Sequence, residues 1–277
     1  MSRAPVAECP VCRAMAPLAF VHPEARVHRC KVCTHVFSDL GSVVVTETYD
    51  ERYFNETHRR WFEHANLALF RWIAKRIPGR AHSAIDIGCG RGDFVRYLGA
   101  IRRDLRLVGL DLGEIAKNHG VEYWRGDFLV MPIMERFDCV IALAVIEHVR
   151  DVAECAQRFR NICEKDGRVF VMTLNNDSLL YTVARLAHRW GAPLAFERLY
   201  SAHHLHHFTP ASLCRLLEQN GFMVEETYQH NAPLKAIDIP VQGRVARIVL
   251  LAGVAALFLL GSMLKRCYLQ TVVARRM

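Results

Sequence analysis

The chain has 277 residues, 52% of them hydrophobic, and a formal net charge of +8. This length supports one substantial α/β core with a small appendage, and the positive charge suggests an acidic partner, whether anionic lipid, nucleotide-linked substrate or RNA. The N-terminal residues lack the apolar run of an export signal, so we expect a cytosolic protein whose ten cysteines are metal ligands or packing residues rather than disulfides.

Four cysteines form a paired pattern near the N-terminus. Cys9-x-x-Cys12 and Cys30-x-x-Cys33 have the spacing of a Cys₄ zinc site, in which each pair offers two thiolates to one tetrahedral ion. We therefore expect residues 1–40 to form a zinc-ribbon-like segment of two small hairpins, held by structural Zn²⁺ because so short a segment cannot build its own core. The alternative is two free-thiol turns in a disordered tail. Three nearby histidines are expected at the surface: His22, His28 and His35.

Residues 41–80 are predicted to be a linker and a cover helix. Apolar residues recur at helical spacing over positions 58–77, and Pro78-Gly79 ends the pattern. The aromatic side chains of this helix are expected in the core.

A glycine-rich turn dominates residues 83–94. A short apolar run containing Asp86 is followed by Gly88, Gly90 and Gly92 at every second position, which predicts a strand, a tight turn and a helix. Glycines there let the backbone approach a ligand at the carboxyl edge of a parallel sheet. The spacing Gly-x-Gly-x-Gly differs from the dinucleotide pattern and favours a nucleoside ligand without a pyrophosphate.

The run Asp86-Ile87-Gly88-Cys89-Gly90-Arg91-Gly92 resembles the first motif of the class I S-adenosylmethionine-dependent methyltransferases. The resemblance covers roughly residues 50–277. It implies an enzyme that uses S-adenosylmethionine and an α/β, Rossmann-like, seven-stranded sheet in a domain spanning residues 81–277. The cysteine-rich segment and the later Tyr49-x-x-x-Tyr53-Phe54 pattern resemble bacterial methyltransferases found with surface-polysaccharide and secondary-metabolite pathways, where a short ribbon precedes the catalytic domain.

Two acidic residues follow predicted strands. Asp111 ends the second strand, where a carboxylate can accept hydrogen bonds from both ribose hydroxyls; capping of the next helix is the alternative role. For Asp127, after the third strand at 121–125, the resemblance implies a hydrogen bond to the adenine amino group, with Phe128 offering an amide. The expected cofactor-binding residues are Asp86, Gly88, Cys89, Gly90, Gly92, Asp111, Leu112, Asp127, Phe128 and Leu143.

Two histidines are candidate catalytic bases, because imidazole titrates near neutral pH. His148 follows the fourth strand in a segment close to the family's Leu-Glu-His sequence, and no Asn/Asp-Pro-Pro-Tyr motif occurs there, which argues against N-methylation of nucleic-acid bases. His204 precedes Thr209-Pro210, a predicted helix start. Packing at that helix start and a metal site in the histidine run are the alternatives for His204.

Two insertions are predicted within the domain. Residues 175–208, after the fifth strand at 168–174, are expected to form a substrate lid. Residues 240–266 lie between the sixth strand (222–229) and the seventh (268–275), which are antiparallel neighbours in this class, and contain an uncharged run at 248–264 at the short limit for a membrane span.

Because both flanking strands belong to one sheet, the chain must return on the same side of any bilayer. We therefore predict a membrane-surface or re-entrant element whose basic ends face anionic headgroups. Gly253 and Gly261 also allow a helical hairpin, and a buried helix or an oligomer contact is the alternative. The flanking basic residues are Arg244, Arg247, Lys265 and Arg266.

Taken together, these features predict an S-adenosylmethionine-dependent methyltransferase that acts on an oxygen of a small or lipid-linked acceptor, such as a quinone precursor or a polyprenyl-linked glycan. We expect it to be peripheral on the cytoplasmic face of a membrane, in contact through residues 244–266. A ribosomal RNA methyltransferase whose ribbon grips RNA, and a non-catalytic S-adenosylmethionine-binding subunit, are the alternatives.

Overall fold

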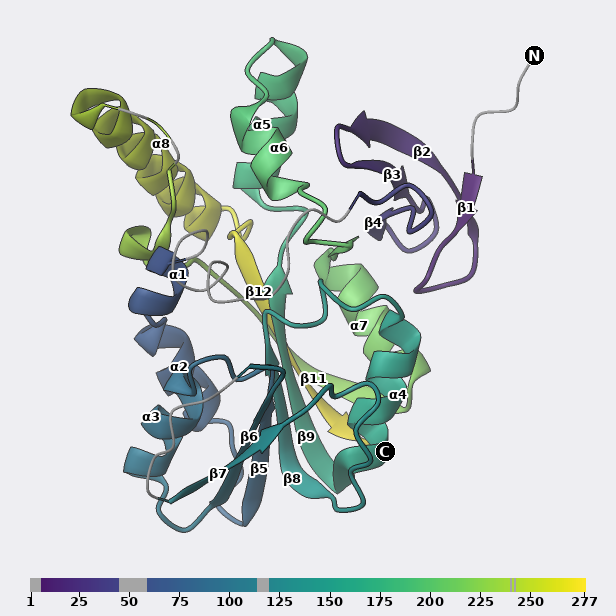
Figure 1. Ribbon diagram of the computed structural model, residues 1–277, viewed down its shortest axis with the longest axis vertical. Helices are drawn as coiled ribbons and strands as arrows, with labels where there is room; N and C mark the ends of the chain where they lie inside the picture. Colours follow the sequence, from purple (N-terminus) through teal and green to yellow (C-terminus); the bar gives the residue numbers. More distant parts are fainter. Residues whose placement is uncertain (1–5, 45–58, 114–119, 240, 242) are drawn as a thin grey trace.

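The computed structural model describes residues 6–44, 59–113, 120–239, 241 and 243–277 (Figure 1). A seven-stranded sheet forms its centre, in the order β11-β12-β9-β8-β5-β6-β7. Only β12 runs antiparallel to its neighbours β9 and β11, as expected for the last two strands. The strands are β5 (Ser83–Ile87), β6 (Arg106–Asp111), β7 (Val121–Arg125), β8 (Phe137–Leu143), β9 (Cys163–Leu174), β11 (Phe222–His230) and β12 (Leu269–Arg276).

Helices cover both faces of this sheet (Figure 1). Helices α2 (Leu67–Ala74) and α3 (Asp93–Ile101) lie on one face, and α4 (Val152–Ile162) and α7 (Pro210–Gln219) lie on the other. Alternate residues of β5 enter the two hydrophobic clusters, Ile85 and Ile87 on the α4 side and Ala84 on the α2 side. This two-sided burial explains the nearly continuous apolar strands, and the α/β methyltransferase-type fold predicted from the sequence is confirmed.

The predicted cover helix is instead two short helices, α1 (Arg59–Glu63) and α2. Asn66 breaks the helical run, because its side-chain oxygen accepts a hydrogen bond from the Leu69 amide (3.1 Å) and so caps a new helix. The Tyr49-x-x-x-Tyr53-Phe54 pattern lies outside the described residues.

The N-terminal segment forms a second sheet that includes a strand from the catalytic domain. Its order is β1-β2-β3-β4-β10, where β10 (His206–His207) pairs antiparallel with β4 (Val36–Ser38). The other strands are β1 (Val6–Glu8), β2 (Met15–His22) and β3 (Ala25–Arg29). The ribbon is therefore docked on the domain rather than tethered beside it.

Burial of the ribbon histidines corrects the expectation that they lie at the surface. His22, His28 and His35 are at most 3% exposed. His35 lies at the joint between the two sheets, with its Nε2 atom 3.1 Å from Nδ1 of His206. Docking of β4 on β10 buries it, and this contact between distant segments has no local sequence signal.

The two insertions project from the carboxyl edge of the central sheet (Figure 1). Residues after β9 form α5 (Leu179–Arg189) and α6 (Leu194–Leu199), and a short 3₁₀ turn, η2 (Leu234–Ala236), precedes α8 (Arg244–Met263). Helix α8 runs unbroken through Gly253 and Gly261, so the hairpin is not formed. Its only buried residues are Phe258 and Gly261, which also argues against the buried-helix alternative.

Candidate active site

The turn after β5 has the backbone geometry that its glycines were expected to provide. Gly88, Gly90 and Gly92 all have positive φ angles. A Cβ atom on Gly88 would lie 2.5 Å from Cγ2 of Val145, so a side chain is excluded there. The Gly88 amide donates to the carbonyl of Leu110 (2.7 Å), which ties the turn to the end of β6.

Asp111 organises the edge of the sheet beside this turn. Its Oδ2 accepts a hydrogen bond from the Gly90 amide (2.7 Å) and its Oδ1 accepts one from the Gly113 amide (2.9 Å). Its own carbonyl accepts a hydrogen bond from Gly126 (2.9 Å), just before Asp127. The ends of β5, β6 and β7 are therefore held together by hydrogen bonds to the side chain and the backbone carbonyl of Asp111.

A cavity of about 600 Å³ opens at this edge. Its wall includes seven of the ten residues expected to bind the cofactor: Gly88, Gly90, Asp111, Leu112, Asp127, Phe128 and Leu143. Asp86 and Cys89 line a smaller adjoining cavity, together with Gly88 and Gly90. Gly92 lines neither cavity; it precedes the first residue of α3 and packs against Tyr123.

Asp86 is a buried acid with an oxygen, Oδ1, that has no hydrogen-bond partner among the described residues. Burial raises the pKa of this carboxyl well above its usual range, and the nearby charge of Asp111 raises it further. A cationic ligand beside Asp86 and Asp111 would offset both the burial and this repulsion, and so favour the ionised form of Asp86.

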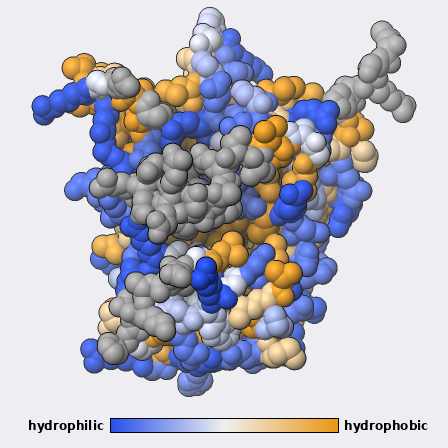
Figure 2. Space-filling view, in the orientation of Figure 1, coloured by the Kyte–Doolittle hydropathy of each residue, from blue (hydrophilic) through white to orange (hydrophobic). Residues whose placement is uncertain are grey.

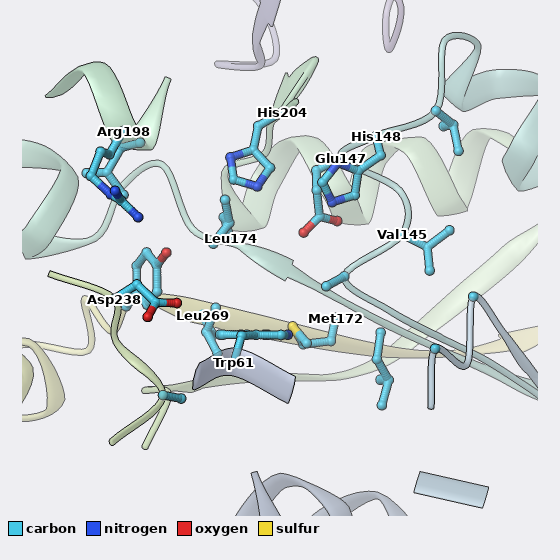
Figure 3. A pocket seen from close by; sticks show the side chains of 18 of the residues that line it. Trp61, Val145, Glu147, His148, Met172, Leu174, Arg198, His204, Asp238 and Leu269 are labelled. Atoms are coloured by element: carbon cyan, nitrogen blue, oxygen red, sulfur yellow. The ribbon is translucent and has the colours of Figure 1, made fainter. Parts of the chain in front are cut away.

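The two candidate bases, His148 and His204, lie next to each other in the lining of the large cavity (Figure 3). The rings of His148 and His204 are 5.1 Å apart between centroids. Nδ1 of His148 lies 2.7 Å from the carbonyl oxygen of His203, so this nitrogen is the donor and Nε2 carries the lone pair of the neutral ring.

Glu147 is a site residue that the sequence reasoning missed. It is 1% exposed, and Figure 3 shows its carboxyl group beside the two histidines. Oε2 has no hydrogen-bond partner among the described residues, and burial raises the pKa of Glu147 to about 7. Its carbonyl accepts hydrogen bonds from the amides of Leu205 (2.8 Å) and His206 (3.1 Å), which fixes the segment after His204. The sequence feature that could have indicated this role is an acidic residue in the mostly apolar segment that follows β8.

Both insertions contribute to the cavity. Leu180, Leu194 and Arg198 come from the α5–α6 insertion, and Leu250 and Val254 come from α8. Trp61, expected in the core, also lines the cavity and is only partly buried, because the break at Asn66 redirects α1.

The four ribbon cysteines are brought together as predicted. Their sulfur atoms all lie within 4.8 Å of one another, with Cys9 to Cys33 at 3.5 Å and Cys12 to Cys30 at 3.4 Å. Tetrahedral zinc with Zn–S bonds of about 2.3 Å requires S···S separations of roughly 3.8 Å, so this donor set fits structural Zn²⁺. Within the described parts of the chain it is the only such group, and the histidine run does not form one.

The mixed sheet, the glycine turn and the acidic ends of the next two strands define a class I S-adenosylmethionine-dependent methyltransferase. Residues 51–227 match the methyltransferase domain family, and the chain belongs to that family. Its methyl donor is S-adenosylmethionine. The site fits this donor, because Gly88 and Gly90 leave room for a nucleoside, Asp111 can accept from ribose hydroxyls, and the acidic edge suits a sulfonium cation.

Curated relatives include ubiquinone biosynthesis O-methyltransferases. The protein of Aeromonas salmonicida (strain A449) is 27% identical over 215 residues, covering 71% of this chain and 87% of its own. The mitochondrial protein of Bos taurus is 28% identical over 175 residues, covering 57% and 46%.

Solved structures confirm the fold. The 1,6-didemethyltoxoflavin-N1-methyltransferase of Burkholderia thailandensis, with bound S-adenosylhomocysteine, has a TM-score of 0.53 at 15% identity and covers 91% of this chain and 99% of its own. A methyltransferase of Archaeoglobus fulgidus has a TM-score of 0.53 at 18% identity and covers 82% and 100%.

Proposed function

We propose that the protein methylates a hydroxyl oxygen of a quinone precursor or a similar small, lipid-linked acceptor, as a peripheral protein on the cytoplasmic face of a membrane. The observation that carries the proposal is one continuous cavity. Its lining includes Asp111 and Asp127, Glu147 and the two histidines, and apolar residues of α8. The names of the curated relatives support an oxygen acceptor and a quinone precursor.

The protein residues have a limited chemical task, because S-adenosylmethionine supplies an already activated methyl group. They must orient the acceptor, exclude water and take up the hydroxyl proton. We infer that His148 or His204 takes up this proton, since both line the cavity and Nε2 of His148 carries a lone pair. The histidine that takes up the proton becomes positively charged. Glu147, whose pKa is raised to about 7, can stabilise this imidazolium when its carboxyl group is ionised.

Helix α8 supports the membrane part of the proposal. Among the described residues it is the one helix long and apolar enough to cross a membrane, yet only 11% of its most apolar window is buried. Figure 2 shows apolar residues gathered over it at the upper left of the molecule. Because β11 and β12 anchor both ends of this insertion in one sheet, attachment to the membrane surface fits better than a single crossing.

The basic residues at the two ends of α8 have different surroundings. Arg244 and Lys265 are exposed, as headgroup contacts require. Arg266 instead donates hydrogen bonds to the carbonyl of Asp177 (2.8 Å) and to Oγ1 of Thr182 (2.7 Å), so it joins the end of α8 to the α5–α6 insertion. We therefore assign the headgroup contacts to Arg244 and Lys265.

Transfer of labelled methyl groups into a fractionated cell extract tests the proposed reaction. We expect label in organic-extractable material as an alkali-stable methyl ether, lost with Asp111→Ala and kept with Asp104→Ala, a control at an exposed carboxylate before β6. Label in RNA would favour the ribosomal RNA alternative. Absence of label from every fraction, with folded protein, would favour the non-catalytic subunit.

A further inference from the structure

The large cavity is also lined by polar residues that do not belong to the acidic edge. Arg198 of α6, Asp238 after η2 and Tyr268 before β12 all line it. In Figure 3, Arg198 and Asp238 lie on one side of the pocket, and His204, Glu147 and His148 lie toward the other. An acceptor that fills the cavity therefore contacts both groups of residues.

Arg198 presents unused hydrogen-bond donors to this space. Among the described residues, none forms a hydrogen bond or a close ion pair with its guanidinium group. Asp238 makes an ion pair with Arg60, at 3.8 Å. Burial raises the pKa of Asp238, and the charges of Arg198 and Arg60 both lower it. A planar guanidinium with free N–H groups beside a cavity matches the oxygens of a carboxylate.

Tyr268 supplies a second donor in a fixed position. Its ring stacks on Phe258 of α8 with centroids 5.9 Å apart, and its amide donates to Oδ1 of Asn231 (2.9 Å). Within the described parts of the chain, no residue forms a hydrogen bond with its hydroxyl group. Burial raises the pKa of Tyr268, the charge of Glu147 raises it further, and the charge of Arg198 lowers it. The hydroxyl is therefore neutral, within electrostatic range of both residues.

We infer that Arg198 and the Tyr268 hydroxyl form a subsite for a carboxylate on an aromatic acceptor, whose reacting hydroxyl then lies toward Glu147, His148 and His204. This inference rests on the proposed function and names its acceptor class. The space between the two groups is lined by Trp61, Met172 and Leu269, flat or apolar surfaces that suit a ring (Figure 3).

The charges on this wall favour a monoanion. Asp238 lies on the same side of the pocket as Arg198, and Glu147, when ionised, adds negative charge on the other side, so a dianionic phosphate would be repelled more strongly than a monoanion. A carboxylate needs only the planar pair of donors from Arg198 and one hydroxyl.

Calorimetry on the full chain saturated with S-adenosylhomocysteine tests the subsite, with 3,4-dihydroxybenzoate and catechol as probes. We expect the carboxylate probe to bind about tenfold more tightly, as one charge-assisted hydrogen-bonded pair at an accessible site would give. Arg198→Met should abolish this preference and Tyr268→Phe should reduce it, while both variants keep the affinity of the wild-type protein for S-adenosylhomocysteine.

Arg189→Met is the matched control, because Arg189 belongs to the same insertion, is exposed and does not line the cavity. It should retain the full preference. Equal affinities for the two probes, failure of the carboxylate probe to bind, or loss of preference in Arg189→Met but not in Arg198→Met would overturn the inference. The label-transfer experiment tests the proposed function separately, since calorimetry requires no turnover.

Discussion

The position of Glu147 after a strand can be predicted from the sequence, whereas the burial of its side chain cannot. The residue follows β8 at the carboxyl edge of the sheet, where polar groups commonly serve a ligand. Its carboxyl group is buried because the chain after His204 returns and hydrogen-bonds to the Glu147 carbonyl. The raised pKa of Glu147 therefore depends on a contact between segments far apart in sequence.

This raised pKa predicts a pH-dependent stability. Below pH 4.5 Glu147 is protonated in both the folded and unfolded chain, whereas between pH 4.5 and about 7 the folded chain keeps a proton that the unfolded chain has lost. The free energy of unfolding contributed by this group therefore falls as pH rises through that range. We expect the free energy of unfolding in urea, measured for Glu147→Gln minus wild type, to be about 2 kcal/mol larger at pH 8 than at pH 5.

Glu154→Gln on α4 is the control, because this glutamate is exposed and should show no such gain. A difference between Glu147→Gln and wild type that is the same at both pH values would show that Glu147 has an ordinary pKa.

Single residues differ in how far the sequence could place them. Asp111 and Asp127 were predictable, because Asp111 ends β6 and Asp127 lies two residues after β7, and the carboxyl ends of parallel strands lie at the ligand edge of the sheet. Arg198 and Tyr268 were not, because their place in the cavity depends on how the α5–α6 insertion and α8 fold back over that edge. Their roles, like those of His148 and His204, remain predictions.

Helix α8 predicts membrane binding that specific side chains should carry. Val249, Leu259 and Met263 are each more than 60% exposed. Their joint replacement by Ser should lower partitioning onto vesicles containing anionic lipid by at least about tenfold, because the helix loses apolar area that the membrane would bury. Sedimentation with vesicles measures this, and high salt should weaken wild-type binding as well.

Val130 and Met134, on the loop between β7 and β8, provide the control. They are 75% and 93% exposed, and their replacement by Ser should leave vesicle binding unchanged. Equal loss in the control, or wild-type protein that stays in the supernatant, would contradict membrane attachment through α8.

The ribbon predicts a stability that depends on metal. We expect about one Zn²⁺ per chain by elemental analysis. Cys30→Ser should lose it and unfold at a lower temperature, because the metal holds together a sheet that continues into β10. Cys214→Ser on α7, a half-buried thiol outside the cluster, should keep both the metal and the melting temperature. Metal-free wild-type protein, or unchanged melting in Cys30→Ser, would refute a structural zinc site.

At the scale of elements, most local signals predicted the structure correctly, whereas contacts between distant segments could not be predicted. Strand ends, glycine turns and the helix start at Thr209 follow from nearby residues, and Thr209 does accept a hydrogen bond from the Ser212 amide (3.1 Å). Strand β10 was missed because two histidines show no alternating pattern and pair only with the ribbon. The capping role of Asn66 was overlooked because the apolar spacing continues on both sides of it.

At the scale of the whole molecule, one cavity joins parts with separate origins. The central sheet supplies the acidic edge, the α5–α6 insertion supplies Arg198, and α8 supplies an apolar wall. The ribbon contributes indirectly, because β4 pairs with β10 close to His204. The chain has a net charge of +8, whereas the edge that binds S-adenosylmethionine is acidic. The acidic edge therefore suits the cationic methyl donor, and the overall positive charge suits an anionic membrane surface.

Titration calorimetry with S-adenosylhomocysteine tests the central claim most directly. The account predicts one binding site per chain in the wild-type protein, at least about tenfold weaker binding in Asp111→Ala, and wild-type affinity in Asp104→Ala. Folded wild-type protein that releases no heat of binding, or Asp111→Ala that binds as well as wild type, would contradict the assignment of this sheet edge as the donor site.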